Sequence, residues 1–69
     1  MQLHQILRII SIESPIVLLD SACVRIAKVR SKIEIDLDLY EYRVLGIGSA
    51  NTMFVENMYQ PCIYIIIEK

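Results

Sequence analysis

The sequence predicts an α+β fold, in which a short N-terminal amphipathic helix packs on an antiparallel sheet of about four strands. Three observations predict it. Apolar residues recur at helical spacing near the start of the chain, residues 27–39 alternate between apolar and charged, and the stretches 15–19 and 63–67 are almost continuously apolar. A chain of 69 residues has the length of one small domain, so we expect a single domain over residues 1–69.

The helix is predicted from Leu3, Ile6, Leu7 and Ile10, which follow the spacing i, i+3, i+4, i+7. Polar residues occupy most of the other positions in these two to three turns. A helix this short is marginal in isolation, so packing on the sheet must hold it. The β-branched residues at its end leave a strand over 10–12 open as the alternative.

The first strand is predicted at 15–19, because this run is apolar throughout and begins with a proline, which suits the first residue of a strand. Asp20 and Ser21 follow with the chemistry of a turn. The chain then returns from Cys23 into the alternating segment, so the two strands are expected to form a hairpin.

Residues 27–39 show the alternation that is typical of a strand with one buried and one solvated face. Their charged positions carry three bases in the first half and three acids in the second. If the segment pairs antiparallel with a copy of itself about Ile33, every base lies opposite an acid, which contributes roughly 0.2–1 kcal/mol per pair. The same charges could instead pair within one chain, across the hairpin. The residues predicted to drive self-association are Lys28, Arg30, Lys32, Glu34, Asp36 and Asp38.

The alternating strand is expected to continue to about Ile35, whereas residues 36–41 fit either a strand or a helical turn. The apolar parity changes after Leu39, and such a change requires a bulge, a turn or a helical turn.

Two further strands are predicted at 43–49 and 62–68, with the longest loop of the chain at 49–60 between them. The last strand is apolar from 63 to 67, as expected of a strand that is covered on both faces.

The composition indicates assembly rather than binding to nucleic acid. Hydrophobic residues make up 55% of the chain without counting glycine, whereas globular domains average about 45–50% with glycine included. A small core cannot bury this excess, so we expect a homo-oligomer, a dimer or a tetramer, or a partner protein that covers the remainder. The net charge of −1 argues against general nucleic-acid binding.

Membrane insertion and export are not expected. The longest apolar run is far shorter than the roughly 20 residues that span a bilayer, and the N-terminus shows no recognisable leader, so the expected location is cytoplasmic. Cys23 and Cys62 are expected to be reduced and buried, as small hydrophobic residues.

The sequence shows no arrangement that points to catalysis or to a metal. His4 is the only histidine, and no nucleophile or acid is positioned with it by sequence. Gly46 and Gly48 lack the third glycine and the following helix of a phosphate-binding loop. Acids that alternate along a strand are spaced by about 7 Å, too far apart for a compact cation site. We therefore predict no enzymatic activity, no cofactor and no metal.

Two groups of residues are candidate contacts for a ligand or a partner. Bases concentrated in residues 25–32, together with two tyrosines, have the chemistry to bind phosphate and stack a base, as in a nucleotide held between subunits. Charge pairing across strands is the favoured interpretation for most of these bases. Residues 51–59 are rich in methionine and aromatic residues, which suits a protein contact or a loop that folds onto its own core. The candidates are Arg25, Arg30, Tyr40, Tyr42, Met53, Phe54 and Tyr59.

The chain resembles small accessory proteins encoded by bacteriophages and other mobile elements. The resemblance lies in the opening with Leu3, Ile6 and Leu7, in the strand at 15–19, in the segment 39–44 and in the isoleucine-rich last strand. It implies a class of protein that blocks a host defence by binding a host protein or by sequestering a nucleotide signal. We therefore predict a non-enzymatic, homo-oligomeric inhibitor that binds a host protein. The alternatives are an oligomer that sequesters a nucleotide and a regulator that binds nucleic acid.

Overall fold

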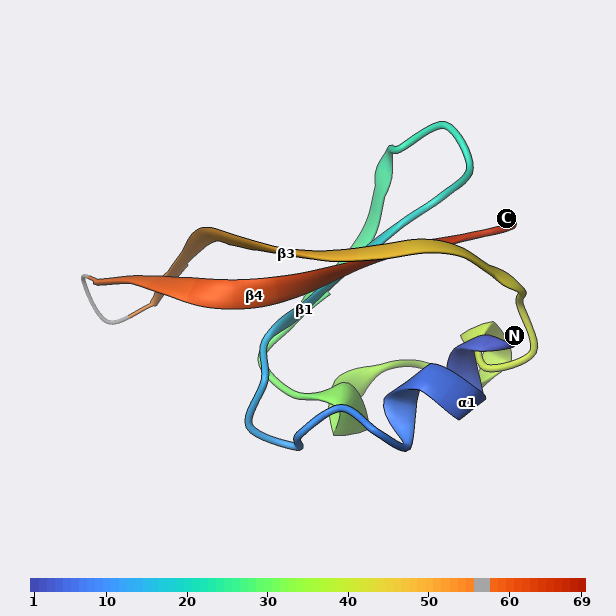
Figure 1. The fold of residues 1–69 in the computed structure, drawn as a ribbon, viewed down its shortest axis with the longest axis horizontal. Coiled ribbons are helices and arrows are strands. Elements are labelled where there is room, and N and C mark those ends of the chain that lie inside the picture. The colour runs from blue at the N-terminus through green and yellow to red at the C-terminus, as the bar shows by residue number, and fades with distance from the viewer. Residues whose placement is uncertain (56–57) are drawn as a thin grey trace.

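A computed structural model describes the backbone of residues 1–55 and 58–69 and the side chains of residues 1–49 and 61–69. The chain forms one short helix, two 3₁₀ turns and a four-stranded sheet (Figure 1). In chain order the elements are α1 (Leu3–Leu7), β1 (Ile16–Leu19), β2 (Arg25–Val29), η1 (Lys32–Glu34), η2 (Leu37–Leu39), β3 (Val44–Val55) and β4 (Met58–Ile67).

The strand order of the sheet is β2-β1-β4-β3. β1 pairs antiparallel with β2, and β3 pairs antiparallel with β4, but β1 and β4 run parallel. The α+β class is therefore confirmed, whereas the prediction of a purely antiparallel sheet is wrong. The reason lies in the two continuous apolar runs, which form the two central strands and pair with each other. Strands in parallel pairs are characteristically apolar along their whole length.

The core lies between one face of the sheet and the layer formed by α1, η1 and η2 (Figure 1). The sheet contributes Ile16 and Leu18 from β1 and Ile65 and Ile67 from β4, and each of these side chains is fully buried. The opposing layer contributes Leu3, Ile6, Leu7, Ile10, Ile35 and Leu39. All four residues from which the helix was predicted are therefore in the core.

The helix itself is shorter than predicted, because α1 ends at Leu7. Gln5 begins it by accepting a hydrogen bond from the Gln2 backbone amide through its side-chain oxygen at 2.8 Å. At the other end, the Lys32 ammonium donates to the carbonyls of Leu7 and Ile10, both at 2.7 Å. Carbonyls that a longer helix would satisfy with its own amides are thus satisfied by a side chain from another element.

The β1–β2 hairpin forms as predicted, and Asp20 organises its turn. The Asp20 carboxylate accepts hydrogen bonds from the backbone amides of Ala22 and Val24, each at 2.9 Å. The Asp20 carbonyl accepts from the amide of Cys23, and that residue has a φ of 63°. A tight turn followed by a left-handed residue is the usual form of a three-residue hairpin loop, and glycine is the usual occupant of the left-handed position. Cys23 is also exposed, so its predicted burial is wrong, whereas Cys62 is buried as expected.

Replacing Cys23 by glycine should raise the free energy of unfolding by about 0.5–1 kcal/mol, because the left-handed backbone penalises a β-carbon and glycine relieves that cost. Urea denaturation of the two proteins measures the difference. Ala22→Gly is the matched control in the same loop, since Ala22 lies at a negative φ and should lose rather than gain stability. Equal effects of the two substitutions would contradict this explanation.

The prediction that the alternating strand continues to Ile35 is wrong. β2 ends at Val29, and residues 32–34 form a 3₁₀ turn. The Glu34 carboxylate accepts hydrogen bonds from the amides of Arg30 and Ser31, at 3.0 and 3.2 Å. The Ser31 hydroxyl donates to the Ile12 carbonyl at 2.6 Å. The Glu34 bonds close the turn on itself, while the bonds of Ser31 and Lys32 tie it to the end of α1 and to the segment that follows it, instead of to a neighbouring strand.

The self-association predicted about Ile33 therefore has no continuous strand on which to form. Lys28 lies on β2, Asp36 and Asp38 lie at η2, and Lys32 and Glu34 are engaged by backbone groups of their own chain. Residues 36–41 include a helical turn at η2, which decides between the two alternatives. Assembly by another surface is a separate question and stays a prediction.

The prediction of a long loop at 49–60 is also wrong, because most of its backbone belongs to two strands. β3 continues to Val55 and β4 begins at Met58, and these two end residues pair with each other. The hairpin extends beyond the rest of the sheet (Figure 1). The prediction that the last strand is covered on both faces is wrong as well, because Tyr64 remains 36% exposed.

Candidate functional site

The face of the sheet opposite α1 is apolar at its centre, although none of the described elements packs over it (Figure 1). Residues that pair across strands share one face of a sheet. Val17 on β1 pairs with Tyr64 on β4, and Leu19 pairs with Ile66. Val17, Leu19 and Ile66 are only partly buried and Tyr64 is 36% exposed, whereas Ile16, Leu18 and Ile65, which point to the opposite face, are fully buried. We call this surface, which Val17, Leu19, Tyr64 and Ile66 define, the open face.

The two edges of the open face differ in shape and charge. On the β2 side, Lys28 pairs with Val17 and Arg25 pairs with Leu19, and both basic side chains are exposed. On the β3 side, Gly46 pairs with Ile66 and Gly48 pairs with Tyr64, so this edge carries no side chains at these positions. The surface thus runs from a raised basic edge through an apolar centre to a bare edge.

Tyr64 partly fills the bare edge. A β-carbon at Gly48 would lie 2.3 Å from the Tyr64 Cζ and hydroxyl, so the phenol ring lies directly over this glycine. A β-carbon at Gly46 would lie 3.6 Å from the Ile66 Cδ1, which is an ordinary contact. Gly46 therefore accepts a side chain without strain, whereas Gly48 does not.

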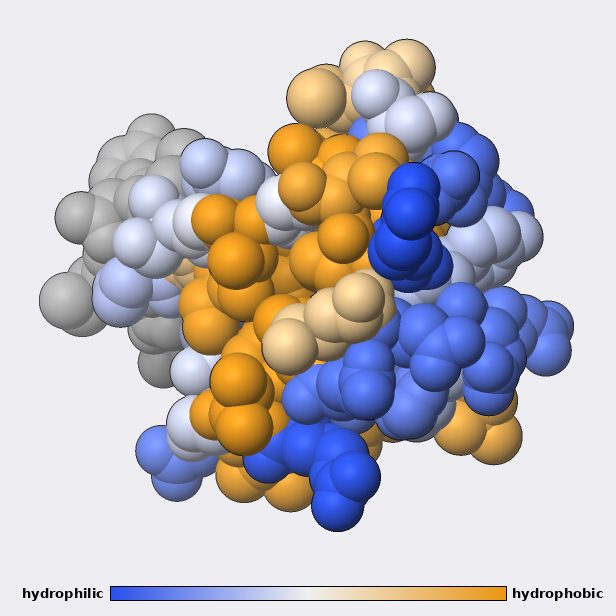
Figure 2. Space-filling model, turned by 45° about the vertical axis from the view of Figure 1, so that its right-hand side comes forward, coloured by the Kyte–Doolittle hydropathy of each residue, from blue (hydrophilic) through white to orange (hydrophobic). Residues whose placement is uncertain are grey.

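Further apolar side chains reach the surface around the sheet. Val24, Leu45 and Ile47 are each about half exposed or more. Figure 2 shows apolar side chains running down the centre of one side of the molecule, beside a strongly hydrophilic area. The apolar excess of the composition is thus partly at the surface, as a core of this size requires.

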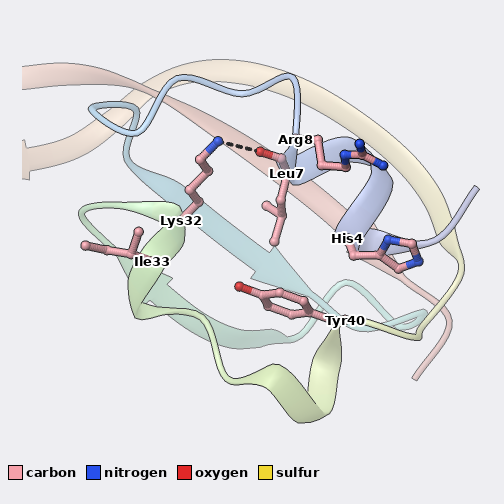
Figure 3. Close-up of a pocket in the computed structure, with 6 residues that line it drawn as sticks. All are labelled: His4, Leu7, Arg8, Lys32, Ile33 and Tyr40. Atoms are coloured by element: carbon pink, nitrogen blue, oxygen red, sulfur yellow. Dashed lines mark hydrogen bonds between the residues drawn. The ribbon is translucent and has the colours of Figure 1, made fainter.

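A second feature is an open pocket of about 290 Å³ on the other side of the molecule, between α1 and the two 3₁₀ turns (Figure 3). His4 and Leu7 come from α1, and Arg8 follows at its end. Lys32 and Ile33 come from η1, and Tyr40 follows η2. Leu7 is buried and forms the apolar base of the pocket, while Ile33 is 70% exposed at its rim.

The lining of this pocket includes two permanent cations and no carboxylate. The Lys32 ammonium is fixed by its two bonds to carbonyls of the α1 end. The His4 Nε2 lies 2.9 Å from the Gln2 side-chain oxygen, which orients the ring. Within the described part of the chain, no hydrogen bond or ion pair engages the Arg8 guanidinium or the Tyr40 hydroxyl. These two groups are available to a ligand.

The structure separates the residues that were predicted to bind one nucleotide. Arg25 lies on the open face, and Tyr40 lies in the pocket. Tyr42 is packed against the core, with the Lys69 ammonium 5.2 Å from its ring centre. Arg30 follows β2 and is exposed. The side chains of the other three candidates, Met53, Phe54 and Tyr59, lie outside the described residues.

Sequence reasoning missed Arg8, Lys32 and Ile33 as pocket residues. A readable signal existed for part of the site, because His4 and Arg8 are four residues apart and therefore share one helix face. The approach of η1 to the same face depends on contacts between distant segments, which no local pattern encodes.

Comparisons with protein-family models, with curated proteins and with solved structures found no match to this chain. Within the described residues, no group of three or more histidine, cysteine, aspartate or glutamate side chains is placed to hold a metal ion. Among the same residues, no helix has the length and apolar character needed to cross a bilayer.

Proposed function

We propose that this protein is a small, non-enzymatic interaction protein that works as a homo-oligomer, with a second copy of the chain docked on the open face. The observation that carries the proposal is the partial exposure of Val17, Leu19, Tyr64 and Ile66 at the centre of the sheet. A sheet face that is meant to stay in water alternates to polar residues at these positions, and this one does not.

The two edges of the open face indicate how a second copy docks. A twofold axis parallel to the strands places β2 of one copy over β3 of the other. The long side chains of Arg25 and Lys28 then lie over the bare strand that carries Gly46. An axis perpendicular to the strands would instead place the basic residues over their own copies, where like charges repel. Shape and charge thus both favour the first arrangement, a twofold interface in which each surface complements itself.

Gly46→Thr should weaken this dimer at least tenfold while leaving the folded monomer intact. The substitution places a side chain on the bare edge where the partner's basic residues would lie. Within one chain its β-carbon makes an ordinary contact, and a β-branched residue suits a strand better than glycine does. Sedimentation velocity over a range of concentrations gives the dissociation constant. Four strands span roughly 19 Å, a small interface, so we expect a micromolar value for the unmodified protein.

Ile9→Thr is the matched control, because Ile9 is 79% exposed on the helix side of the molecule. It removes apolar surface without touching the open face, so the dimer should persist. A chain that stays monomeric at every concentration would overturn the proposal. A dimer that survives Gly46→Thr and is lost in Ile9→Thr would overturn it too, because assembly would then use the helix side.

The wider role follows the resemblance to phage accessory proteins. We propose that the assembled protein acts in the cytoplasm by binding a host protein and inhibiting a defence. Both statements stay predictions, as does the alternative of a nucleic-acid-binding regulator. Sequestration of a nucleotide between subunits by Arg25 and Arg30 also stays an alternative prediction.

A further inference from the structure

We infer that the pocket between α1 and the 3₁₀ turns binds a nucleoside monophosphate. The charges indicate an anion, because Arg8 and Lys32 are among the lining residues and no carboxylate is. A guanidinium binds phosphate through two parallel hydrogen bonds, and Arg8 has no other partner within the described residues. This inference does not depend on the proposed dimer.

The two sides of the pocket differ in chemistry. Figure 3 shows Arg8 and His4 together on one side, and Lys32 and Ile33 on the other. The phosphate therefore belongs beside Arg8 and His4. Leu7 at the base of the pocket offers apolar contact to a flat ring, and Ile33 is 70% exposed at the rim.

The Tyr40 hydroxyl and the Lys32 ammonium can bind the ribose and the base of a nucleoside monophosphate. The Tyr40 hydroxyl, directed toward the Lys32 side in Figure 3, can bond a ribose hydroxyl or the edge of a base. An ammonium carries three donors, and Lys32 uses two of them on carbonyls, so one remains for the ligand. The volume of about 290 Å³ lies at the lower end for small-molecule pockets, which fits one ring and one phosphate rather than a dinucleotide.

Titration calorimetry with the four ribonucleoside 5′-monophosphates tests the inference, with adenosine and inorganic phosphate as the two partial ligands. At least one monophosphate should bind about tenfold more tightly than either partial ligand. The inference is overturned if none of the four binds at millimolar concentration, or if adenosine binds as tightly as its monophosphate, because the phosphate would then not be recognised.

Arg8→Gln locates the site. It should weaken monophosphate binding about tenfold and leave the thermal transition nearly unchanged, because the Arg8 side chain is exposed and makes no hydrogen bond or ion pair within the described residues. Arg30→Gln is the matched control, an exposed arginine outside the pocket, and should bind like the unmodified protein. Equal losses in the two variants would mean that general positive charge, and not this pocket, holds the ligand. Gly46→Thr, which changes the open face, should bind the monophosphate as the unmodified protein does. Failure of the dimer proposal and failure of the pocket proposal can therefore be told apart.

Discussion

Ile65→Ala should lower the free energy of unfolding by about 3–4 kcal/mol, the typical cost of emptying a core site in a tightly packed interior. Ile65 is fully buried in the central strand β4, where it pairs with Leu18 of β1 and with Ile47 of β3. A domain of this length has a total stability of roughly 3–10 kcal/mol. The substitution should therefore leave the chain close to unfolded, and urea denaturation followed by circular dichroism measures the loss.

Ile66→Ala is the matched control, because the next residue of the same strand points to the opposite face. Ile66 is partly buried beside Gly46 on the open face, so its truncation should cost the monomer about 1 kcal/mol. The larger effect of this variant should be on the dimer, whose centre Ile66 would occupy. If both variants destabilise the monomer equally, the core does not lie on one side of the sheet, and the distinction between the two faces is wrong.

Local patterns predicted the parts of the fold that local physics determines. The spacing of Leu3, Ile6, Leu7 and Ile10 identified the buried side of the N-terminal segment, although the regular helix stops at Leu7. Asp20 marked the hairpin turn through a side chain that bonds its own neighbouring amides. The interactions of the hairpin turn lie within a few residues of one another, whereas the helix shows only its pattern locally and is held by packing on the sheet.

The parallel pairing of β1 with β4 was missed because it joins segments that are more than forty residues apart. Their composition nevertheless held a signal, since continuous apolar runs are typical of central, parallel strands. The alternation over 27–39 was misread for a different reason. Ser31 and Glu34 form the S-x-x-E pattern of a capping box, which is local and competes with a strand. A regular alternation therefore predicts a strand only where no capping pattern interrupts it.

Most of the candidate site could not be predicted, because both surfaces are products of tertiary arrangement. The open face depends on which side of the sheet α1 covers, and the alternation of residues along a strand does not predict that side. The basic residues were read as one group because they are close in sequence. Strand β2 carries Arg25 and Lys28 onto the open face, whereas the 3₁₀ turn carries Lys32 to the pocket.

Lys32→Met should lower the free energy of unfolding by about 2–3 kcal/mol, because it removes two hydrogen bonds from a charged donor in a partly buried place. The carbonyls of Leu7 and Ile10 would lose their partner at the end of α1, where a cation is also favoured by the helix dipole. Methionine keeps most of the apolar stem of lysine, so the loss reports the ammonium rather than the packing. The amide of Ile9, which bonds the Ile6 carbonyl in the last turn, should exchange its hydrogen faster.

Lys28→Met is the control, since Lys28 is exposed on β2 and engages no described partner. Measuring both variants in the Gly46→Thr background removes any contribution of the dimer, and Lys28→Met should then change stability by less than about 0.5 kcal/mol. If the two variants have equal effects, Lys32 contributes only net charge. The 3₁₀ turn would then need another cause, because the bonds of Lys32 and Ser31 to residues 7–12 are what separate this segment from the strand that its alternation predicts.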